Sequence, residues 1–210
     1  MTKLYEAWPG LYGVTQHFFR FTGTALMHVE GARYIPKEPA VILAKHRSLL
    51  EVLQLSYVVG VRTGKIPLIA MNAGLPKQYG WFGGVPIDRG SDQKEMPQKE
   101  FNARSFARLR QGLEERSIIA FPEGHRWPDR MGRLLTGLLG ELVNNQYPVV
   151  PAGVNHSWLS LTNKIKIPYE STIKFGPPRT YHSVKDMNIR AFREELATLS
   201  GLELKVKSEE

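Results

Sequence analysis

The chain has 210 residues, which is enough for one domain with a full hydrophobic core. Hydrophobic residues make up 42% and charged residues 23%, a balance typical of globular and not of disordered proteins. No cysteine is present, which excludes disulfides, thiolate zinc sites and a cysteine nucleophile. The formal net charge of +8 favours an anionic partner, such as a membrane surface, a nucleic acid or a phosphorylated substrate, although a basic housekeeping domain can carry the same charge.

The first 30 residues are rich in aromatic side chains, but they have neither the pattern of a signal peptide nor an apolar run long enough to span a membrane. Within residues 8–29, apolar residues recur at helical spacing, at positions 11, 14, 18, 21 and 25. We expect residues 1–30 to be an amphipathic helical segment that lies in a membrane interface. A helix packed on the protein's own core would show the same spacing, so the pattern leaves both possibilities open.

From residue 41 onward, predicted strands alternate with predicted helices. The predicted strands are 41–44, 66–71, 85–87, 118–121, 149–154 and one or two within 165–175. The predicted helices are 48–61, 97–115, 130–145 and 185–199, and the glycine-rich residues 72–84 predict a loop. The alternation predicts a single α/β domain over residues 31–200, with a mostly parallel sheet flanked by helices and a charged tail at 201–210.

Polar residues follow several of these strands directly. His46 follows the strand at 41–44, Asp88 and Arg89 follow the strand at 85–87, and Glu123 follows the strand at 118–121. In α/β proteins, sites gather at the carboxyl ends of parallel strands. We therefore expect these residues to contribute to one site.

His46 and Glu51 form a candidate base with a nearby acid. On a continuous helix, five residues turn about 500°, which leaves the two side chains roughly 140° apart. They can meet only if His46 lies in the strand-to-helix turn and Glu51 in the first helical turn, with Ser48 as the N-cap. Glu51 would then orient the imidazole while the other ring nitrogen takes a proton from an acceptor hydroxyl.

The residues Ser48-Leu49-Leu50-Glu51 also fit a capping box. In that interpretation Glu51 accepts a hydrogen bond from the backbone N–H of Ser48 and does no chemistry. The two roles can coexist because a carboxylate has two oxygens.

Two further stretches carry arginines beside glycines, in Gly83–Arg89 and in Phe121–Arg126. Each arginine is a candidate phosphate ligand, although a glycine turn that ends in a surface ion pair explains the first stretch equally well taken alone. Asp88 would orient Arg89 or act as a structural acceptor. In the second stretch Gly124 allows close approach of the backbone to a ligand, and Glu123 can accept hydrogen bonds from Arg89 or from the loop backbone.

The apolar stretch Val149–Val154 contains Pro151. Because proline is disfavoured in a central strand, Pro151 predicts an edge strand, a bulge or a strand end.

Together these stretches resemble the glycerolipid acyltransferases, the lysophosphatidate (1-acylglycerol-3-phosphate) acyltransferases of the PlsC type. That family has, in order, a His-x4-Asp block, a Gly-x-x-x-Ile-Asp-Arg block, a Phe-Pro-Glu-Gly-Thr-Arg block and a Val-Pro block. The matching residues, in the same order and at the family's usual spacing, are His46, Ser48 and Glu51; Gly83, Ile87, Asp88 and Arg89; Phe121 to Gly124 and Arg126; and Val150-Pro151.

The resemblance implies a glycerol-3-phosphate acyltransferase-like fold and a reaction without a metal, cofactor or covalent intermediate. His46 would act as the base on a lysophospholipid-like acceptor, whose hydroxyl attacks the thioester of acyl-CoA or of acyl carrier protein. Glu51 would be its catalytic partner. The residues implied for binding the acceptor's phosphate are Arg89, Glu123, Gly124 and Arg126, supported by Lys45, Ser48, Asp88 and Pro151. The protein would then be peripheral, at the cytoplasmic face of a membrane.

Three positions depart from the family pattern: Glu51 replaces the usual aspartate, Lys45 an asparagine and His125 a threonine. They indicate an atypical member that acylates a different acceptor. Two other functions stay open, a lipid-binding protein without catalysis and a thioester or lipid hydrolase. A nucleic-acid partner is disfavoured because the 28 lysines and arginines are dispersed and form no platform with aromatic residues.

Overall fold

A computed structural model describes residues 27–48, 50–74, 83–88, 90, 96–143, 147–160 and 166–202. The sequence-predicted helical positions within residues 1–26, the predicted phosphate ligand Arg89 and the tail at 203–210 lie outside this part of the chain.

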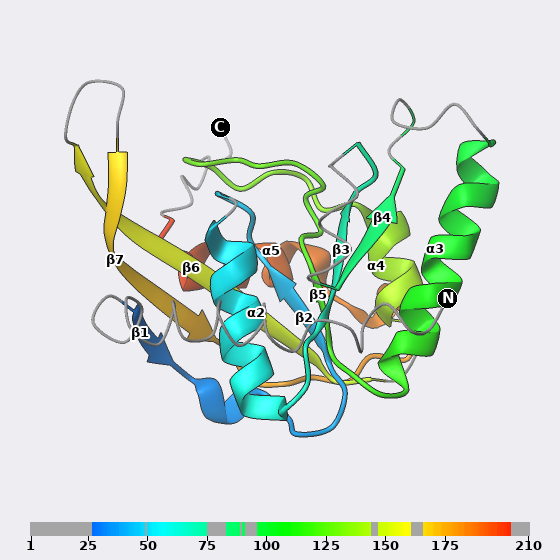
Figure 1. The fold of residues 1–210 in the computed structure, drawn as a ribbon, viewed down its shortest axis with the longest axis horizontal. Coiled ribbons are helices and arrows are strands. Elements are labelled where there is room, and N and C mark those ends of the chain that lie inside the picture. Colours follow the sequence, from blue (N-terminus) through cyan, green and yellow to red (C-terminus); the bar gives the residue numbers. More distant parts are fainter. Residues whose placement is uncertain are drawn as a thin grey trace, which may run out of the picture.

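The described residues form a seven-stranded sheet in the order β1-β7-β6-β2-β5-β3-β4 (Figure 1). The strands are β1 Met27–Glu30, β2 Val41–Ala44, β3 Leu68–Asn72, β4 Gly84–Ile87, β5 Ile118–Ala120, β6 Val149–Ser160 and β7 Lys166–Phe175. The run from β6 to β4 is parallel throughout. Strand β7 pairs antiparallel to β6, and β1 pairs parallel to β7. The predicted single α/β domain with a mostly parallel sheet is therefore confirmed.

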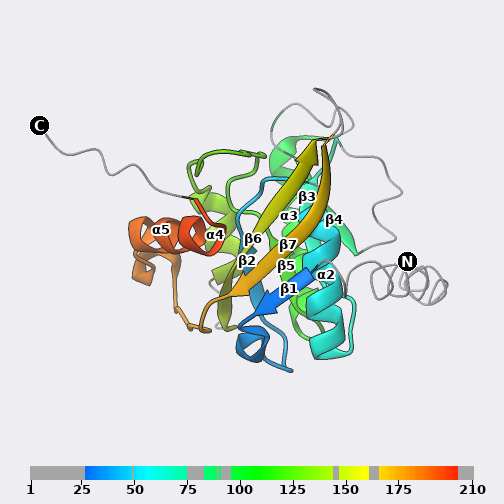
Figure 2. The same ribbon diagram turned by 90° about the vertical axis from the view of Figure 1, so that its left-hand side faces the viewer.

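Helices cover both faces of this sheet. They are α2 Leu50–Thr63, α3 Gln98–Leu113, α4 Thr136–Val143 and α5 Ile189–Leu199, with short 3₁₀ turns η2 Ala32–Tyr34 and η4 Val184–Asp186. Figure 2 shows α2 on one side of the sheet and α4 and α5 on the other. Within the described residues, no helix combines the length and the apolar character that crossing a bilayer requires.

Strand β2 shows why the sheet is buried on both faces. Val41 and Leu43 belong to the core cluster formed with α3, α4 and α5. Ile42 and Ala44 belong to the opposite cluster, which contains residues of α2. Because successive side chains of a strand point to opposite faces, a parallel strand covered on both sides is a continuous apolar run, as the sequence at 41–44 is.

The sequence-predicted helix at 130–145 is wrong in its first part, because α4 begins only at Thr136. Met131 and Leu134 are nevertheless buried in the core, but they enter it from an irregular segment. An apolar residue fills a core equally well from a loop, so the apolar pattern overestimates the length of the helix.

The last four residues of the predicted N-terminal helical segment, 27–30, belong to the described part of the chain and are not helical. Residues 27–30 form β1, with Met27 and Val29 half-buried and His28 and Glu30 exposed. This alternation has the period of a strand, and the parallel pairing with β7 gives the segment its hydrogen bonds. Three residues of the segment 8–29 therefore belong to the sheet.

Of the three positions predicted for Pro151, the edge strand is wrong, because β6 lies between β7 and β2, and so is the bulge, because the register shift of β6 lies at Ser157 and Trp158. The strand end fits best, since Pro151 is the third residue of β6. Pro151 pairs with Leu43 of β2, and the ladder with β7 begins one residue later, at Ala152. The carbonyl of Pro151 accepts a hydrogen bond from the N–H of Gly176, just beyond β7 (2.8 Å). The proline therefore lies where the β7 ladder begins, and its missing N–H interrupts no ladder bond.

Candidate active site

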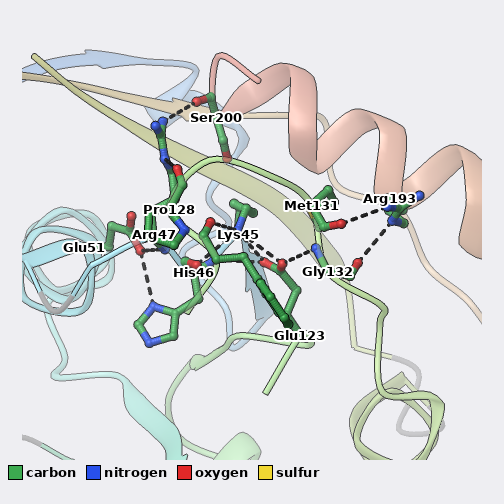
Figure 3. Close-up of polar contacts among 11 residues, drawn as sticks. Lys45, His46, Arg47, Glu51, Glu123, Pro128, Met131, Gly132, Arg193 and Ser200 are labelled. Atoms are coloured by element: carbon green, nitrogen blue, oxygen red, sulfur yellow. Dashed lines mark hydrogen bonds and ion pairs between the residues drawn. The ribbon is translucent and has the colours of Figure 1, made fainter. Parts of the chain in front are cut away.

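The structure brings His46 and Glu51 together at the carboxyl end of β2. His46 lies two residues beyond the strand, and Glu51 is the second residue of α2. Nδ1 of the imidazole is 3.3 Å from Oε2 of the carboxylate (Figure 3). The Glu51 side chain is fully buried, whereas that of His46 keeps 15% of its surface exposed. The pair therefore meets in the turn-and-helix arrangement that the spacing requires.

Glu51 also holds the strand-to-helix turn, although not by the predicted capping-box bond. Its Oε2 accepts a hydrogen bond from the backbone N–H of Arg47 at 2.7 Å, whereas the capping box predicted the N–H of Ser48. The hydroxyl of Ser48 instead lies 3.3 Å from Nε2 of His156. One carboxylate oxygen thus orients both the turn and the imidazole.

The orientation of the His46 ring leaves Nε2 for chemistry. Since a carboxylate only accepts hydrogen bonds, a neutral imidazole in this position would carry its proton on Nδ1 and its lone pair on Nε2. The ring also packs on Phe121, with 4.3 Å between ring centroids. The imidazole is therefore held from two sides, in the arrangement that a general base would need.

A buried ion pair lies beneath His46. The ammonium of Lys45 donates hydrogen bonds to Glu123 (3.1 Å), to the carbonyl of His46 (3.0 Å) and to the carbonyl of Trp127 (2.6 Å). The carboxylate of Glu123 in turn accepts from the backbone N–H groups of His46 (3.1 Å) and Gly132 (2.6 Å). Burial lowers the pKa of Lys45 below its ordinary 10.5, and the attraction of Glu123 opposes that shift. The pair joins the backbone of His46 to the loop after β5.

Two arginines tie the same region to the rest of the domain. Arg193 on α5 donates to the carbonyl of Gly132 at 3.1 Å. Arg47 donates to three oxygens on separate segments: the carbonyl of Pro128 (2.7 Å), the side chain of Asn155 (2.9 Å) and the carbonyl of Ser200 (3.0 Å). The loop after β5 is consequently held from the turn after β2, through Arg47, and from α5, through Arg193 (Figure 3).

The residues predicted to bind phosphate lie in two places. Glu123 is 2% exposed and turned inward onto Lys45, so it supports the loop in which Gly124 and Arg126 lie. Gly124 has a φ of 65°, a left-handed conformation that favours glycine, and Arg126 is exposed. Since Arg89 lies outside the described residues, phosphate binding by this set stays a prediction.

The turn before Arg89 is well fixed. Asp88 is buried and accepts the N–H of Gly90 at 2.8 Å. Asn102 on α3 bonds both the N–H and the carbonyl of Asp88, at 2.8 Å each. The other role predicted for Asp88, orienting Arg89, concerns a residue outside the described part of the chain and stays a prediction.

Sequence reasoning missed a second histidine behind the site. His156 on β6 is almost fully buried, and its Nε2 is 3.9 Å from Oε1 of Glu51. Its Nδ1 is 2.8 Å from the hydroxyl of Ser171 on β7, which also accepts a hydrogen bond from Gln54 on α2 (2.9 Å). No local spacing connects these residues, since they come from three separate elements.

We predict that Lys45→Met strongly destabilises the fold, by about 3–5 kcal/mol, because it leaves the Glu123 carboxylate buried without its cation. The matched control is Arg104→Met, which breaks the exposed Arg104–Glu100 pair and should cost less than about 1 kcal/mol. Urea denaturation measures both free energies of unfolding. Equal, small losses in the two variants would contradict the role given to the Lys45–Glu123 pair.

We also predict a pH dependence of stability from His156. Burial lowers its pKa below the ordinary 6.5, as does Arg47, and Glu51 opposes them only partly. Just below pH 6.5, the His156 imidazole is therefore protonated in more of the unfolded chains than of the folded ones. The contribution of His156 to the free energy of unfolding is then complete above pH 6.5 and is lost progressively as the pH falls from 6.5 toward the lower pKa of the folded state. Denaturation of the wild type and of His156→Gln between about pH 7.5 and 5 should show the steeper loss in the wild type. Parallel curves would refute this.

Comparison with known proteins gives the family and the fold of the chain. The family model described as Acyltransferase matches residues 26–155, more than half of the chain. No curated protein matches the chain. Among solved structures, the 1-acyl-sn-glycerophosphate (LPA) acyltransferase PlsC from Thermotoga maritima superimposes with a TM-score of 0.59 at 20% sequence identity, over 94% of this chain and 80% of that one. The chain belongs to the acyltransferase family and has the fold of the PlsC-type enzymes.

Proposed function

We propose that this protein transfers a fatty acyl group from a thioester donor to a hydroxyl of a lysophospholipid-like acceptor. The observation that carries the proposal is the His46–Glu51 pair, an imidazole held by a buried carboxylate at 3.3 Å, at the carboxyl end of a parallel strand. Membership in the acyltransferase family supports the reaction type.

In the proposed reaction, Nε2 of His46 takes the proton of the acceptor hydroxyl while that oxygen attacks the thioester carbonyl. The carbon–sulfur bond then breaks, and the leaving thiolate receives the proton back from the imidazolium. Glu51 stabilises the transient positive charge across Nδ1. General-base catalysis of this kind contributes about 10²- to 10⁴-fold in rate.

The donor is proposed to be acyl-CoA or acyl carrier protein, and the acceptor to carry a phosphate. Fixed positive charge supports this assignment, because Arg126 is exposed on the loop after β5 and the whole chain carries a net charge of +8. Guanidinium groups bind phosphate oxygens with two parallel hydrogen bonds, which suits Arg89 and Arg126 to the acceptor's headgroup.

Residues 8–26 are proposed to dock the protein on a membrane, at the cytoplasmic face and without crossing the bilayer. The support is their sequence, in which the aromatic residues Trp8, Phe18, Phe19 and Phe21 stand beside Arg20. Such residues partition into the headgroup region, where the acceptor of this reaction would lie.

We predict that His46→Ala lowers turnover by about 10²- to 10⁴-fold, because no base then takes the hydroxyl proton. The control is His182→Ala, which replaces an exposed histidine outside the site and should leave turnover unchanged. The measurement is formation of acylated lyso-phospholipid from labelled acyl-CoA and labelled acyl carrier protein, together with the thermal midpoint of each variant.

Three outcomes of that assay would contradict the proposal. Undiminished transfer by His46→Ala would remove the histidine from the chemistry. Release of free fatty acid without an acylated acceptor would instead indicate a hydrolase. Vesicle binding by the wild type without turnover on any donor and acceptor pair would indicate a lipid-binding protein.

We predict that deleting residues 1–26 lowers binding to vesicles of phosphatidylcholine and phosphatidylglycerol by at least about tenfold, because the aromatic residues are lost while β1 is retained. Co-sedimentation measures the binding, and the thermal midpoint shows whether the shortened chain folds. Deletion of the charged tail at 203–210 is the control. Equal binding by both deletions and the wild type would refute membrane docking by this segment.

A further inference from the structure

The carboxylate of Glu51 has one oxygen that the site described so far does not use. Oε2 contacts His46 and the N–H of Arg47, but Oε1 is buried and accepts no hydrogen bond from any residue that the structure describes. A buried carboxylate oxygen without a donor is costly, because it has lost its water and gained nothing in exchange. Its surroundings therefore indicate which group is placed to satisfy it.

Among the described contacts, the polar group facing Oε1 is the imidazole of His156. Its Nε2 lies 3.9 Å from Oε1, and only 2% of the His156 side chain is exposed. An N–H···O hydrogen bond spans about 2.7–3.2 Å, so an approach of about 1 Å would complete it.

The contacts on the far side of the His156 ring are compatible with a proton on Nε2. Gln54 donates its amide N–H to the hydroxyl of Ser171 (2.9 Å), and that hydroxyl lies 2.8 Å from Nδ1 of His156. A hydroxyl that accepts one bond can still donate its own proton. In the tautomer that the proposal below adopts, Ser171 donates to Nδ1 and the ring proton of His156 lies on Nε2, facing Glu51 and the hydroxyl of Ser48.

The ionisation of His156 agrees with this arrangement. Burial lowers the pKa of its imidazole, with a smaller contribution from Arg47 in the same direction and an opposing one from Glu51. At neutral pH the ring is therefore uncharged and has a single N–H. Glu51 then lies between two imidazoles of different function, the partly exposed His46 and the buried His156.

We propose that His156 is a positioning residue for acyl transfer, whose Nε2–H holds Oε1 of Glu51 so that Oε2 stays on His46. This rests on the proposed function of the His46–Glu51 pair. A glutamate has one more rotatable bond than the aspartate usual in the family, so it loses more rotamer freedom when it is fixed. A donor on each oxygen fixes the longer side chain from both sides.

The first test compares His156→Leu with His156→Gln, which retains an N–H donor. Loss of a hydrogen bond to a charged group predicts that His156→Leu lowers kcat by on the order of 10- to 100-fold with KM little changed, and that His156→Gln restores a large part of it. The same substitutions in a Glu51→Ala background should have no further effect on kcat, because His156 acts through Glu51. The proposal would be overturned if the effects of the His156 substitutions and of Glu51→Ala on kcat were additive. It would also be overturned if His156→Leu and His156→Gln lowered kcat equally.

The second test does not depend on activity. Nitrogen-15 NMR of the imidazole groups at neutral pH identifies the tautomer of each histidine, and His156→Gln assigns the signal by its disappearance. We expect His156 to be neutral with its proton on Nε2. A proton on Nδ1, or a charged imidazolium, would overturn the proposal even if His156→Leu fails to fold.

The two proposals fail in different ways. If the wild type transfers no acyl group, the proposed function fails, while the NMR tautomer still decides whether His156 faces Glu51 with its donor. If transfer depends on His46 but the His156 variants behave additively with Glu51→Ala, the proposed function stands and the positioning role is wrong.

Discussion

The buried Lys45–Glu123 pair is the interaction on which the site depends. Both side chains are fully buried, and between them they bond the backbone of His46, Trp127 and Gly132. A buried ion pair recovers its desolvation cost only when further hydrogen bonds satisfy the remaining protons and oxygens, and here backbone groups of the two adjoining loops provide them. The same bonds that make the pair tolerable therefore fix the turn after β2 against the loop after β5.

The site then follows from the order of strands. Strands β2 and β5 are parallel neighbours, so the residues just beyond them lie side by side, and β4 ends along the same edge with β3 between. His46 lies in the turn after β2, and Asp88 lies in the turn after β4. Gly124 and Arg126 lie in the loop after β5. Helix α2, on the face of the sheet opposite α4 and α5, adds Glu51. Placing a base on a strand-to-helix turn keeps it close to solvent while its acid partner is buried.

Sequence reasoning succeeds where the interacting residues are close in the chain. Glu51 is the fifth residue after His46, and turn geometry alone limits how the two side chains can meet. Continuous apolar runs likewise predict the buried strands. Sequence reasoning fails for two contacts between residues that are distant in the chain: Lys45 with Glu123, 78 residues apart, and Ser48 with His156, 108 residues apart. Side-chain pairing across a sheet leaves no local pattern in the sequence. Pro151 misleads for a related reason: whether a strand lies at an edge depends on its partners, which the strand's own sequence does not encode.

In the proposed reaction His46 acts as a base on the acceptor hydroxyl, and neither as a nucleophile nor as an activator of water. The most direct measurement is rapid-quench mass spectrometry of the intact protein and its products after mixing with a labelled acyl thioester and a lyso-phospholipid. We expect the label to pass to the acceptor while the mass of the protein stays unchanged at every time point. Label bound covalently to the protein before product appears, or recovered as free fatty acid in place of an acylated acceptor, would contradict it.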